Sequence, residues 1–224
     1  MLLRILAACL LAAAQGYLLG GIVFGILISK CFFHDDVRTH GSGSAGMTNM
    51  LRNYGKWAGV GTAVGDIGKS VLAVFIGRWL FAALLPDVGL EPMCGAYLAA
   101  IFAVLGHTAP PFFGFKGGKG VLVGAGAALA TEPLVCLVLL VIFLVEFFIT
   151  RIVSLGSIIL AALYPVATLC FWAWQGANLP SMLFIGVCTA ITGAMVIYMH
   201  RSNIQRLRNG TEYRFGEKKN GSKN

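Results

Sequence analysis

Residues 133–150 read Pro-Leu-Val-Cys-Leu-Val-Leu-Leu-Val-Ile-Phe-Leu-Val-Glu-Phe-Phe-Ile-Thr, an apolar run in which Glu146 is the one charged residue. A helix needs about 20 mostly apolar residues to cross the hydrocarbon core of a bilayer, which is roughly 30 Å thick. The run therefore predicts a membrane-spanning helix. Because one such helix makes the chain an integral membrane protein, this stretch decides the class of fold.

Similar apolar runs lie on both sides of this one. The 224 residues are 58% hydrophobic and 12% charged, with a mean hydropathy of +0.81, whereas soluble domains are typically about 25% charged. We therefore expect an all-α integral membrane protein with seven transmembrane helices. The predicted spans cover residues 5–28, 57–80, 93–113, 120–130, 133–150, 155–174 and 182–199. The fourth is too short to cross easily alone, so we expect a short or re-entrant segment there.

These spans leave no room for a separate soluble domain. We expect residues 1–212 to form a single polytopic membrane domain and residues 213–224, which are basic and polar, to form a cytoplasmic tail. Two processing signals compete with the first span: Ala12-Ala13-Ala14 resembles a signal-peptide cleavage site, and Leu6-Ala7-Ala8-Cys9 resembles a lipoprotein box. The apolar run continues well past the former and barely precedes the latter. A membrane span is therefore the preferred interpretation.

Lysine and arginine favour the cytoplasmic side of a membrane protein, so their distribution predicts the orientation. With seven spans and a cytoplasmic C-terminus, that side receives Lys30, Arg38, Arg52, Lys56, Lys116, Lys119, Arg151, Arg201, Arg206, Arg208, Arg214, Lys218, Lys219 and Lys223. The outer side keeps Arg4 and Arg78, with Asp87, Glu91 and Glu132 in its loops. We therefore expect the N-terminus outside and the C-terminus in the cytoplasm. This placement also explains the net charge of +8 without a nucleic-acid partner.

Three polar segments interrupt the apolar chain, and this orientation puts all three on the cytoplasmic face. The first, residues 41–52, combines glycines and hydroxyl groups with Asn49 and Arg52. Backbone N–H groups, hydroxyls and a planar cationic fork are the groups that bind phosphate oxygens. Taken alone, the segment fits a flexible linker equally well.

The second polar segment, residues 106–120, ends with Lys116 and Lys119 among four glycines. The competing interpretation is a positively charged anchor at the membrane surface, which would need the lysines but not the glycines. Because the glycines leave backbone N–H groups accessible at the start of a span, we favour an anion-binding turn.

The third polar segment joins residues 151–158 to residues 200–207. If the last span continues as a helix, His200 and Asn203 lie on one face, because residues three apart are neighbours. Such a face can bind a hydroxyl or a phosphate. A single histidine at a membrane boundary is more often only interfacial, so this interpretation depends on the other two segments.

Asp66 and Lys69 are charged residues inside the second span, where an unpaired charge is costly. Their spacing of three predicts an ion pair, either structural or in contact with substrate. Residues 65–70 resemble a nucleotide-binding P-loop only superficially, because the glycine spacing and the preceding strand are missing. The six cysteines form no C-x-x-C pair, so we expect no metal site.

Taken together, the three segments resemble the acyl-phosphate:glycerol-3-phosphate acyltransferase family (PlsY) of bacterial inner membranes over nearly the whole chain. Ser44, Met47 and Ala109 stand where that family usually has asparagine, alanine and an aromatic residue. The matching residues are Gly41-Ser42-Gly43, Thr48-Asn49, Arg52, Gly55-Lys56 and the Asp66/Lys69 pair, then Gly106-His107, Pro110 and residues 115–121, and finally residues 154–158, His200-Arg201, Asn203-Ile204, Arg206-Leu207 and Gly210-Thr211-Glu212.

The resemblance implies a multi-pass enzyme of the bacterial plasma (inner) membrane, with its active site facing the cytoplasm. Such an enzyme transfers a fatty acyl group from acyl phosphate to glycerol 3-phosphate, giving lysophosphatidic acid and inorganic phosphate in phospholipid synthesis. Membrane lipid is an expected partner, while a cofactor, a metal, a nucleotide and a nucleic acid are not expected. We expect a monomer.

Acyl phosphate is already activated, so the site needs to hold two anionic groups and aim a hydroxyl at a carbonyl, without a covalent intermediate. The expected catalytic residues are His200, Ser42, Arg52, Lys119 and Asn203. The expected substrate-binding residues are Gly43, Thr48, Asn49, His107, Gly117, Gly118, Ser154 and Ser157. His200 is the first candidate for orienting or deprotonating the acceptor hydroxyl and His107 the second, although the donor's own phosphate could take the proton.

Two other classes of protein compete with an enzyme. A transporter or channel for an organic phosphate would carry polar residues through several spans toward the outer face, but only Asp66, Lys69 and Glu146 lie deep in the predicted spans. A scaffold membrane protein would leave three phosphate-binding segments unexplained. The sequence therefore favours the acyltransferase.

Overall fold

The computed structural model describes residues 1–216, and all regular structure in this range is helical. The amino-terminal half contains α1 (Leu2–Gly20), α2 (Phe24–Phe33), the 3-10 turn η1 (Val37–Thr39), α3 (Met47–Tyr54), α4 (Lys56–Leu84) and α5 (Met93–Thr108). The rest contains the 3-10 turn η2 (Pro111–Phe113), α6 (Val121–Thr131), α7 (Pro133–Thr150), α8 (Val153–Trp174), α9 (Leu179–Met199) and α10 (Arg201–Arg208). The all-α prediction is confirmed for this part of the chain.

Six helical segments are long and apolar enough to cross a membrane, where the sequence predicted seven. The first combines α1 and α2, and the others are α4, α5, α7, α8 and α9. The predicted short segment is present as α6, which has 11 residues. At a rise of 1.5 Å per residue, α6 is about 16 Å long, roughly half of the hydrocarbon thickness.

The predicted first span, residues 5–28, is not one continuous helix. α1 ends at Gly20 and α2 begins at Phe24. The ammonium group of Lys69 in α4 donates hydrogen bonds to the carbonyl oxygens of Gly20 (3.0 Å) and Ile22 (2.7 Å) at this break. Because these carbonyls have a buried donor, the helix can end inside an apolar run without leaving polar groups unpaired.

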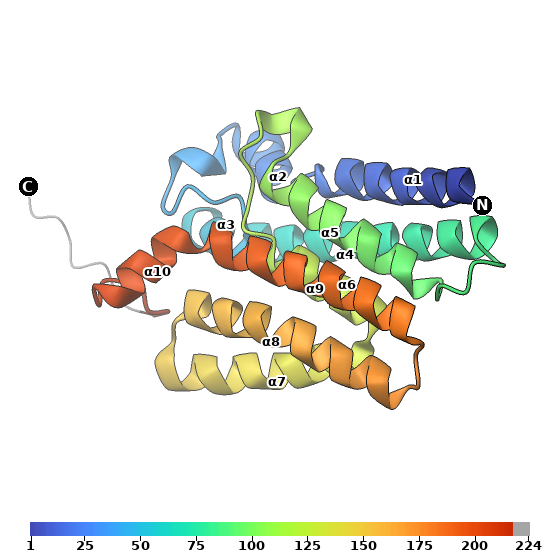
Figure 1. Ribbon diagram of the computed structural model, residues 1–224. Coiled ribbons are helices and arrows are strands. Elements are labelled where there is room, and N and C mark those ends of the chain that lie inside the picture. Colours follow the sequence, from blue (N-terminus) through green and yellow to red (C-terminus); the bar gives the residue numbers. More distant parts are fainter. Residues whose placement is uncertain (217–224) are drawn as a thin grey trace, which may run out of the picture.

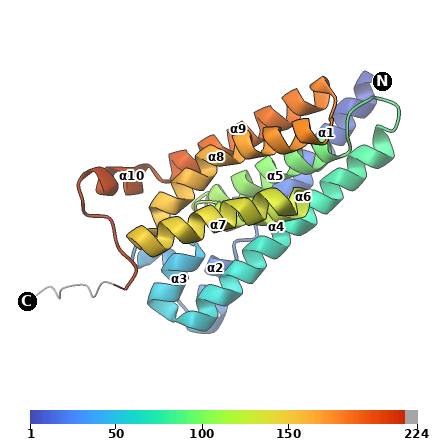
Figure 2. The same ribbon diagram turned by 90° about the horizontal axis from the view of Figure 1, so that it is seen from below.

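The long helices lie alongside one another, and the two ends of the described chain lie at opposite ends of the bundle (Figures 1 and 2). α5 is the central helix, since thirteen of its sixteen residues are buried. Small residues allow α1 to approach it closely: a Cβ atom added at Gly20 would lie 2.1 Å from the carbonyl oxygen of Ala103 in α5. Such contacts between small residues are typical of helices that pack in lipid.

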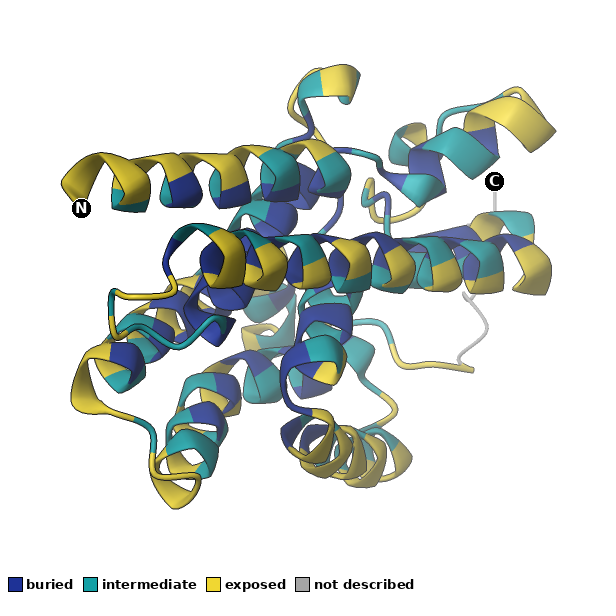
Figure 3. Cartoon of the chain, turned by 90° about the vertical axis from the view of Figure 1, so that its right-hand side faces the viewer, coloured by how far each residue is buried: buried dark blue, intermediate teal, exposed yellow. Residues whose placement is uncertain are grey.

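The outer surface of the bundle is apolar. Figure 3 shows exposed residues along the outward faces of the helices and buried residues on their inward faces. Large apolar side chains such as Leu3, Trp79, Phe148 and Leu183 are among the exposed residues. This much exposed apolar surface is unfavourable in water and is expected for a surface that contacts lipid.

Glu132 was predicted in an outer loop, but its side chain does not face solvent. It lies between α6 and α7 and is fully buried. Its carboxylate accepts hydrogen bonds from the hydroxyl of Tyr97, the hydroxyl of Thr168 (2.9 Å) and the indole N–H of Trp172 (2.6 Å). Three donors from α5 and α8 thus satisfy a carboxylate that the sequence alone would place in water.

The predicted tail begins at residue 213, but its first residues contact the folded part of the chain. The ring of Phe215 packs against that of Phe147 in α7, with 5.7 Å between the centroids. The backbone N–H of Phe215 also donates to the carbonyl oxygen of Arg151 at 2.7 Å. Residues 217–224 of the predicted tail lie outside the described residues.

Candidate active site

A cavity of about 1430 Å³ opens at the end of the bundle that carries α3 and α10. All three polar segments contribute to it. Of the residues predicted from the sequence, it is lined by Ser42, Thr48, Asn49, Arg52, Asp66, His107, Lys119, Ser154, Ser157, His200 and Asn203. Gly43, Gly117, Gly118 and Lys69 are not among the lining residues. The structure therefore brings together most of the predicted site from five helices and three connections between helices.

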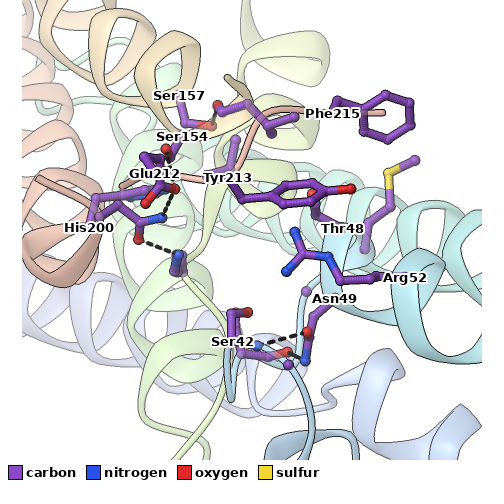
Figure 4. Close-up of a pocket in the computed structure, with 18 of the residues that line it drawn as sticks. Ser42, Thr48, Asn49, Arg52, Ser154, Ser157, His200, Glu212, Tyr213 and Phe215 are labelled. Atoms are coloured by element: carbon purple, nitrogen blue, oxygen red, sulfur yellow. Dashed lines mark hydrogen bonds between the residues drawn. The ribbon is translucent and has the colours of Figure 1, made fainter. Parts of the chain in front are cut away.

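The first polar segment folds around the buried side chain of Asn49. The Asn49 amide accepts a hydrogen bond from the backbone N–H of Ser42 (3.1 Å). It donates three more, to the carbonyl oxygens of Val37 (3.1 Å), His40 (3.0 Å) and Ser44 (2.9 Å). Its Oδ1 also accepts a hydrogen bond from the side-chain amide of Asn53 (3.0 Å). Because the other bonds go to the loop backbone, Asn49 shapes the loop and holds Ser42 at the cavity wall (Figure 4).

The second polar segment contributes Lys119, whose ammonium donates to Oδ1 of Asn203 in α10. Burial is the main cause that lowers the pKa of Lys119 to about 8, and the positive charges of Arg206 and Arg52 act in the same direction, against Glu212. A partly buried cation with other cations near it is stabilised when an anion binds beside it. The arrangement therefore suits a phosphate group.

Gly117 and Gly118 were predicted to bind substrate, but in the structure they pack against α5. Their backbone N–H groups donate to the carbonyl oxygens of Thr108 (3.2 Å) and His107 (3.1 Å), so these N–H groups are not free for an anion. A Cβ atom at Gly118 would lie 2.1 Å from Nε2 of His107, and one at Gly117 would lie 1.9 Å from the His107 oxygen. Glycine is needed here for close packing on α5.

Asp66 and Lys69 form the predicted ion pair, with 2.8 Å between Lys69 Nζ and Asp66 Oδ1, and both side chains are buried. Lys69 Nζ also lies 2.9 Å from Nδ1 of His107. Because an ammonium group can only donate, Nδ1 is the acceptor and the ring proton resides on Nε2. His107 is thus arranged as a hydrogen-bond donor at Nε2 and is poorly suited to be a base.

His200 at the end of α9 has the opposite arrangement. Its Nδ1 lies 2.7 Å from the carbonyl oxygen of Val196. A carbonyl can only accept, so Nδ1 carries the proton and the Nε2 lone pair is available. Burial is the main cause that lowers the pKa of His200 to about 4, with a further contribution from the nearby Lys119 charge. The imidazole is therefore neutral at pH 7.

Glu212 connects the parts of the third polar segment and was not among the predicted site residues. Its carboxylate accepts hydrogen bonds from the hydroxyl of Ser154 (2.7 Å), the amide of Asn203 (2.6 Å) and Nε of Arg206 (2.6 Å). Burial opposes ionisation of Glu212, but these three donors outweigh it and lower the pKa of the carboxyl. The signal in the sequence was the place of Glu212 in the Gly210-Thr211-Glu212 match to the family pattern.

Two aromatic residues after α10, Tyr213 and Phe215, also line the cavity. The Tyr213 ring lies over the guanidinium of Arg52, 3.9 Å from ring centroid to Cζ, and Figure 4 shows the two groups facing each other. Both aromatic residues fell in the predicted tail, where the lack of periodicity gave no reason to expect a packed segment.

One part of the cavity wall is apolar. It is formed by the side chains of Leu122, Phe143, Phe147, Val153 and Phe215. Cationic and hydrogen-bonding groups such as Arg52, Lys119 and Ser42 line the same cavity. The site can therefore hold an anionic group and an apolar chain of one amphipathic molecule at the same time.

Comparison with known proteins agrees with this geometry. A family model described as glycerol-3-phosphate acyltransferase matches residues 10–210. A protein of that name from Clostridioides difficile (strain 630) is 42% identical over 210 residues, which cover 94% of this chain and 97% of the relative. One from Carboxydothermus hydrogenoformans is 40% identical, over 95% of this chain and 99% of the relative.

Two solved structures are similar to this one. A crystal structure of PlsY, described as an integral membrane glycerol 3-phosphate acyltransferase in its glycerol 3-phosphate form, gives a TM-score of 0.77 at 35% identity, covering 93% of this chain and 96% of that one. The lysophosphatidic acid form gives 0.74 at 34% identity, with 93% and 95% covered. The family match, the full-length relatives and the shared fold show that the chain belongs to the glycerol-3-phosphate acyltransferase family.

Proposed function

We propose that the protein transfers a fatty acyl group from acyl phosphate to glycerol 3-phosphate, forming 1-acyl-glycerol 3-phosphate (lysophosphatidic acid) and inorganic phosphate in phospholipid synthesis. The observation that carries the proposal is the mixed cavity, which Arg52 and Lys119 line together with Phe143 and Phe147. Acyl phosphate has an anionic head and an apolar chain, and glycerol 3-phosphate brings a second anionic group. The names of the relatives and the two ligand forms of PlsY support the same acceptor and product.

The reaction joins the oxygen of a glycerol hydroxyl to the acyl carbonyl carbon. The bond between that carbon and the phosphate oxygen breaks, and phosphate leaves with the bonding electrons. The hydroxyl proton must then go to a base. Because the donor is already activated, the protein contributes mainly by holding both substrates close together and in the right orientation.

We assign Ser42, Arg52, Lys119 and Asn203 to binding the two phosphate groups. Arg52 and Lys119 supply positive charge, and the Ser42 hydroxyl and the Asn203 amide supply hydrogen bonds. Ser154 and Ser157 lie at the beginning of α8, where the positive end of the helix dipole adds to the attraction. Asn49 and Glu212 hold these groups in place through the hydrogen bonds described above.

We assign His200 to orienting the acceptor hydroxyl, which can donate to the free lone pair on Nε2. With a pKa lowered to about 4, the imidazole is a weak base. A phosphate monoester has a second pKa of about 6, so the departing phosphate is the better acceptor for the proton. We therefore infer that His200 aims the hydroxyl and that the donor's own phosphate takes up the proton.

We also propose that the protein lies in the bacterial plasma membrane with seven spans, its N-terminus outside and its site facing the cytoplasm. The distribution of lysine and arginine supports this orientation. The ends of the described chain lie at opposite ends of the bundle, which supports an odd number of spans. α6 and the buried break at Glu132 would form the short fourth span, because non-helical backbone is tolerated at that depth when protein covers it. Residues 1–212 would act as one domain, in a monomer.

One assay tests the function. Purified protein in detergent micelles is incubated with glycerol 3-phosphate and, in separate reactions, with palmitoyl phosphate or palmitoyl-CoA, and lysophosphatidic acid is measured. We expect product from the acyl phosphate and none from the acyl-CoA. Comparable turnover with both donors contradicts the proposed donor, and no turnover with either contradicts the reaction. The Arg52→Ala variant is the matched control, because it shows how much lysophosphatidic acid forms when the proposed site is impaired.

A further inference from the structure

The Tyr213 ring stacks on the Arg52 guanidinium, although the two residues are far apart in the sequence. Arg52 is in the last turn of α3, and Tyr213 follows α10. Both residues line the cavity. The 3.9 Å distance from Cζ to the ring centroid is well within the roughly 6 Å over which a cation and an aromatic ring attract each other.

Contacts on both sides keep Tyr213 in this position. The residue before it, Glu212, is fixed by three hydrogen bonds from α8 and α10. Two residues after it, Phe215 is fixed by its N–H bond to the Arg151 oxygen and by its ring contact with Phe147. The segment is thus attached on both sides of Tyr213, and the ring has a defined place over the guanidinium.

The stack leaves the hydrogen-bonding groups of Arg52 free. The five N–H donors of a guanidinium point outward in its plane, while its two faces are weakly hydrated and stack well on aromatic rings. Within residues 1–216, the Arg52 guanidinium makes no hydrogen bond and no ion pair, and Tyr213 covers one face. The ring therefore restricts a long flexible side chain without using any of its donors.

We propose that Tyr213 is a positioning residue that preorganises Arg52 to bind a substrate phosphate. The inference rests on the proposed function and deepens it by naming the group that orients one of its phosphate ligands. Tyr213 acts through Arg52, and its ring is what matters, because the face-on contact needs no hydroxyl. A restricted arginine loses less conformational freedom on binding an anion, so affinity rises.

The test compares Tyr213→Leu, which removes the ring, with Tyr213→Phe, which keeps it. Two quantities are measured for each: the KM for both substrates, and the Kd for inorganic phosphate by calorimetry on protein in micelles. We expect Tyr213→Leu to raise the phosphate Kd and at least one KM by about twofold to thirtyfold, the range that a cation–π contact allows. We expect kcat to change by less than about twofold, since a binding effect common to ground and transition states appears in KM. Tyr213→Phe should match the wild type.

Two comparisons separate positioning from a general structural role. In an Arg52→Ala background, Tyr213→Leu should cause no further loss, because a residue that acts only through Arg52 has nothing left to position. Tyr198→Leu is the matched control, since Tyr198 also stacks on an arginine, Arg201 at 4.7 Å, but does not line the cavity; it should leave Kd and KM unchanged.

Each contrary result has its own meaning. Equal losses in Tyr213→Phe and Tyr213→Leu, an added loss in the Arg52→Ala background, or an unchanged phosphate Kd in Tyr213→Leu would overturn the positioning role. A wild-type protein that binds phosphate but transfers no acyl group would contradict the proposed function instead. In that case the phosphate Kd values of the variants still decide the role of Tyr213.

Discussion

The ammonium of Lys119 donates a hydrogen bond to Oδ1 of Asn203, which links the turn before α6 to α10 across the cavity. Asn203 in turn donates its amide N–H to Glu212 at 2.6 Å. A cation, an amide and a carboxylate are therefore connected in series at the place where we expect a phosphate. The charge state of Lys119 should control how well an anion binds there.

Catalytic efficiency should fall as the pH rises through about 8. The pKa of Lys119 is lowered to about 8, so the ammonium is present below that pH and is lost above it, together with its attraction for the anionic substrates. The dependence of kcat/KM on pH reports this ionisation in the free enzyme. Lys119→Arg should move the fall to higher pH, because a guanidinium stays charged. A wild-type profile that is flat to about pH 10, corrected for spontaneous hydrolysis of acyl phosphate, would contradict the assignment.

Arg52→Ala should lower kcat/KM by roughly ten- to a hundredfold. A hydrogen bond to a charged group contributes about 1.5–3 kcal/mol, and the variant loses at least one such contact with a phosphate. Arg52→Lys should restore activity only in part, since a point charge cannot reproduce two parallel hydrogen bonds. Steady-state kinetics with both substrates measure the effect. An Arg52→Ala protein that is folded and fully active would show that the phosphates bind elsewhere.

Lys69→Met should destabilise the fold strongly. The substitution leaves Asp66 buried without its cation and removes the donor for the carbonyl oxygens of Gly20 and Ile22 at the break between α1 and α2. Removing one partner of a buried ion pair typically costs about 3–5 kcal/mol. Thermal unfolding in micelles measures the loss. The double variant Lys69→Met/Asp66→Leu should be less destabilised than Lys69→Met, and equal loss in the two would show that the Asp66 charge is not the cause.

The sequence could predict what depends on local spacing. Asp66 and Lys69 are three residues apart on a helix, so their ion pair was expected, and the structure confirms it. The same spacing could not show that Lys69 also binds two carbonyl oxygens that are 47 and 49 residues away. For that reason the first span was predicted as one helix, although it is two.

The sequence also could not predict which polar groups are buried by distant parts of the chain. Glu132 lies in a short link between two apolar runs, which is typical of a loop at the membrane surface. Its hydrogen-bond donors come from Tyr97, Thr168 and Trp172, which are 35 to 40 residues away. Gly118 likewise looked like part of an anion-binding turn, and only the position of the His107 ring shows that it is needed for packing.

Cysteine labelling in intact bacteria tests the proposed orientation. Single cysteines at Ser44, Gly216 and Asp87 are introduced into a variant whose six native cysteines are replaced by alanine. An impermeant thiol reagent should label the Asp87→Cys protein, whereas the Ser44→Cys and Gly216→Cys proteins should react only after the cells are opened. Opened cells serve as the control that each thiol is accessible. Labelling of both Ser44→Cys and Gly216→Cys from outside would reverse the orientation and the proposed cytoplasmic site.

Ser42→Ala should weaken catalysis without removing a covalent step. The Ser42 backbone is held by Asn49 at the cavity wall, which suits a hydroxyl that donates to a phosphate oxygen. A serine nucleophile would need a base that removes its proton. Of the two histidines that line the cavity in residues 1–216, His200 has the free lone pair, but its pKa of about 4 makes it a weak base. We therefore expect kcat/KM to fall by about fivefold to twentyfold. This corresponds to about 1–1.8 kcal/mol, between the roughly 0.5–1.5 kcal/mol of a neutral hydrogen bond and the roughly 1.5–3 kcal/mol of one to a charged group. Mass spectrometry of wild-type protein quenched during turnover should find no acyl group on Ser42. An acylated Ser42 that forms and decays at the rate of turnover would replace the direct transfer proposed here with a two-step mechanism.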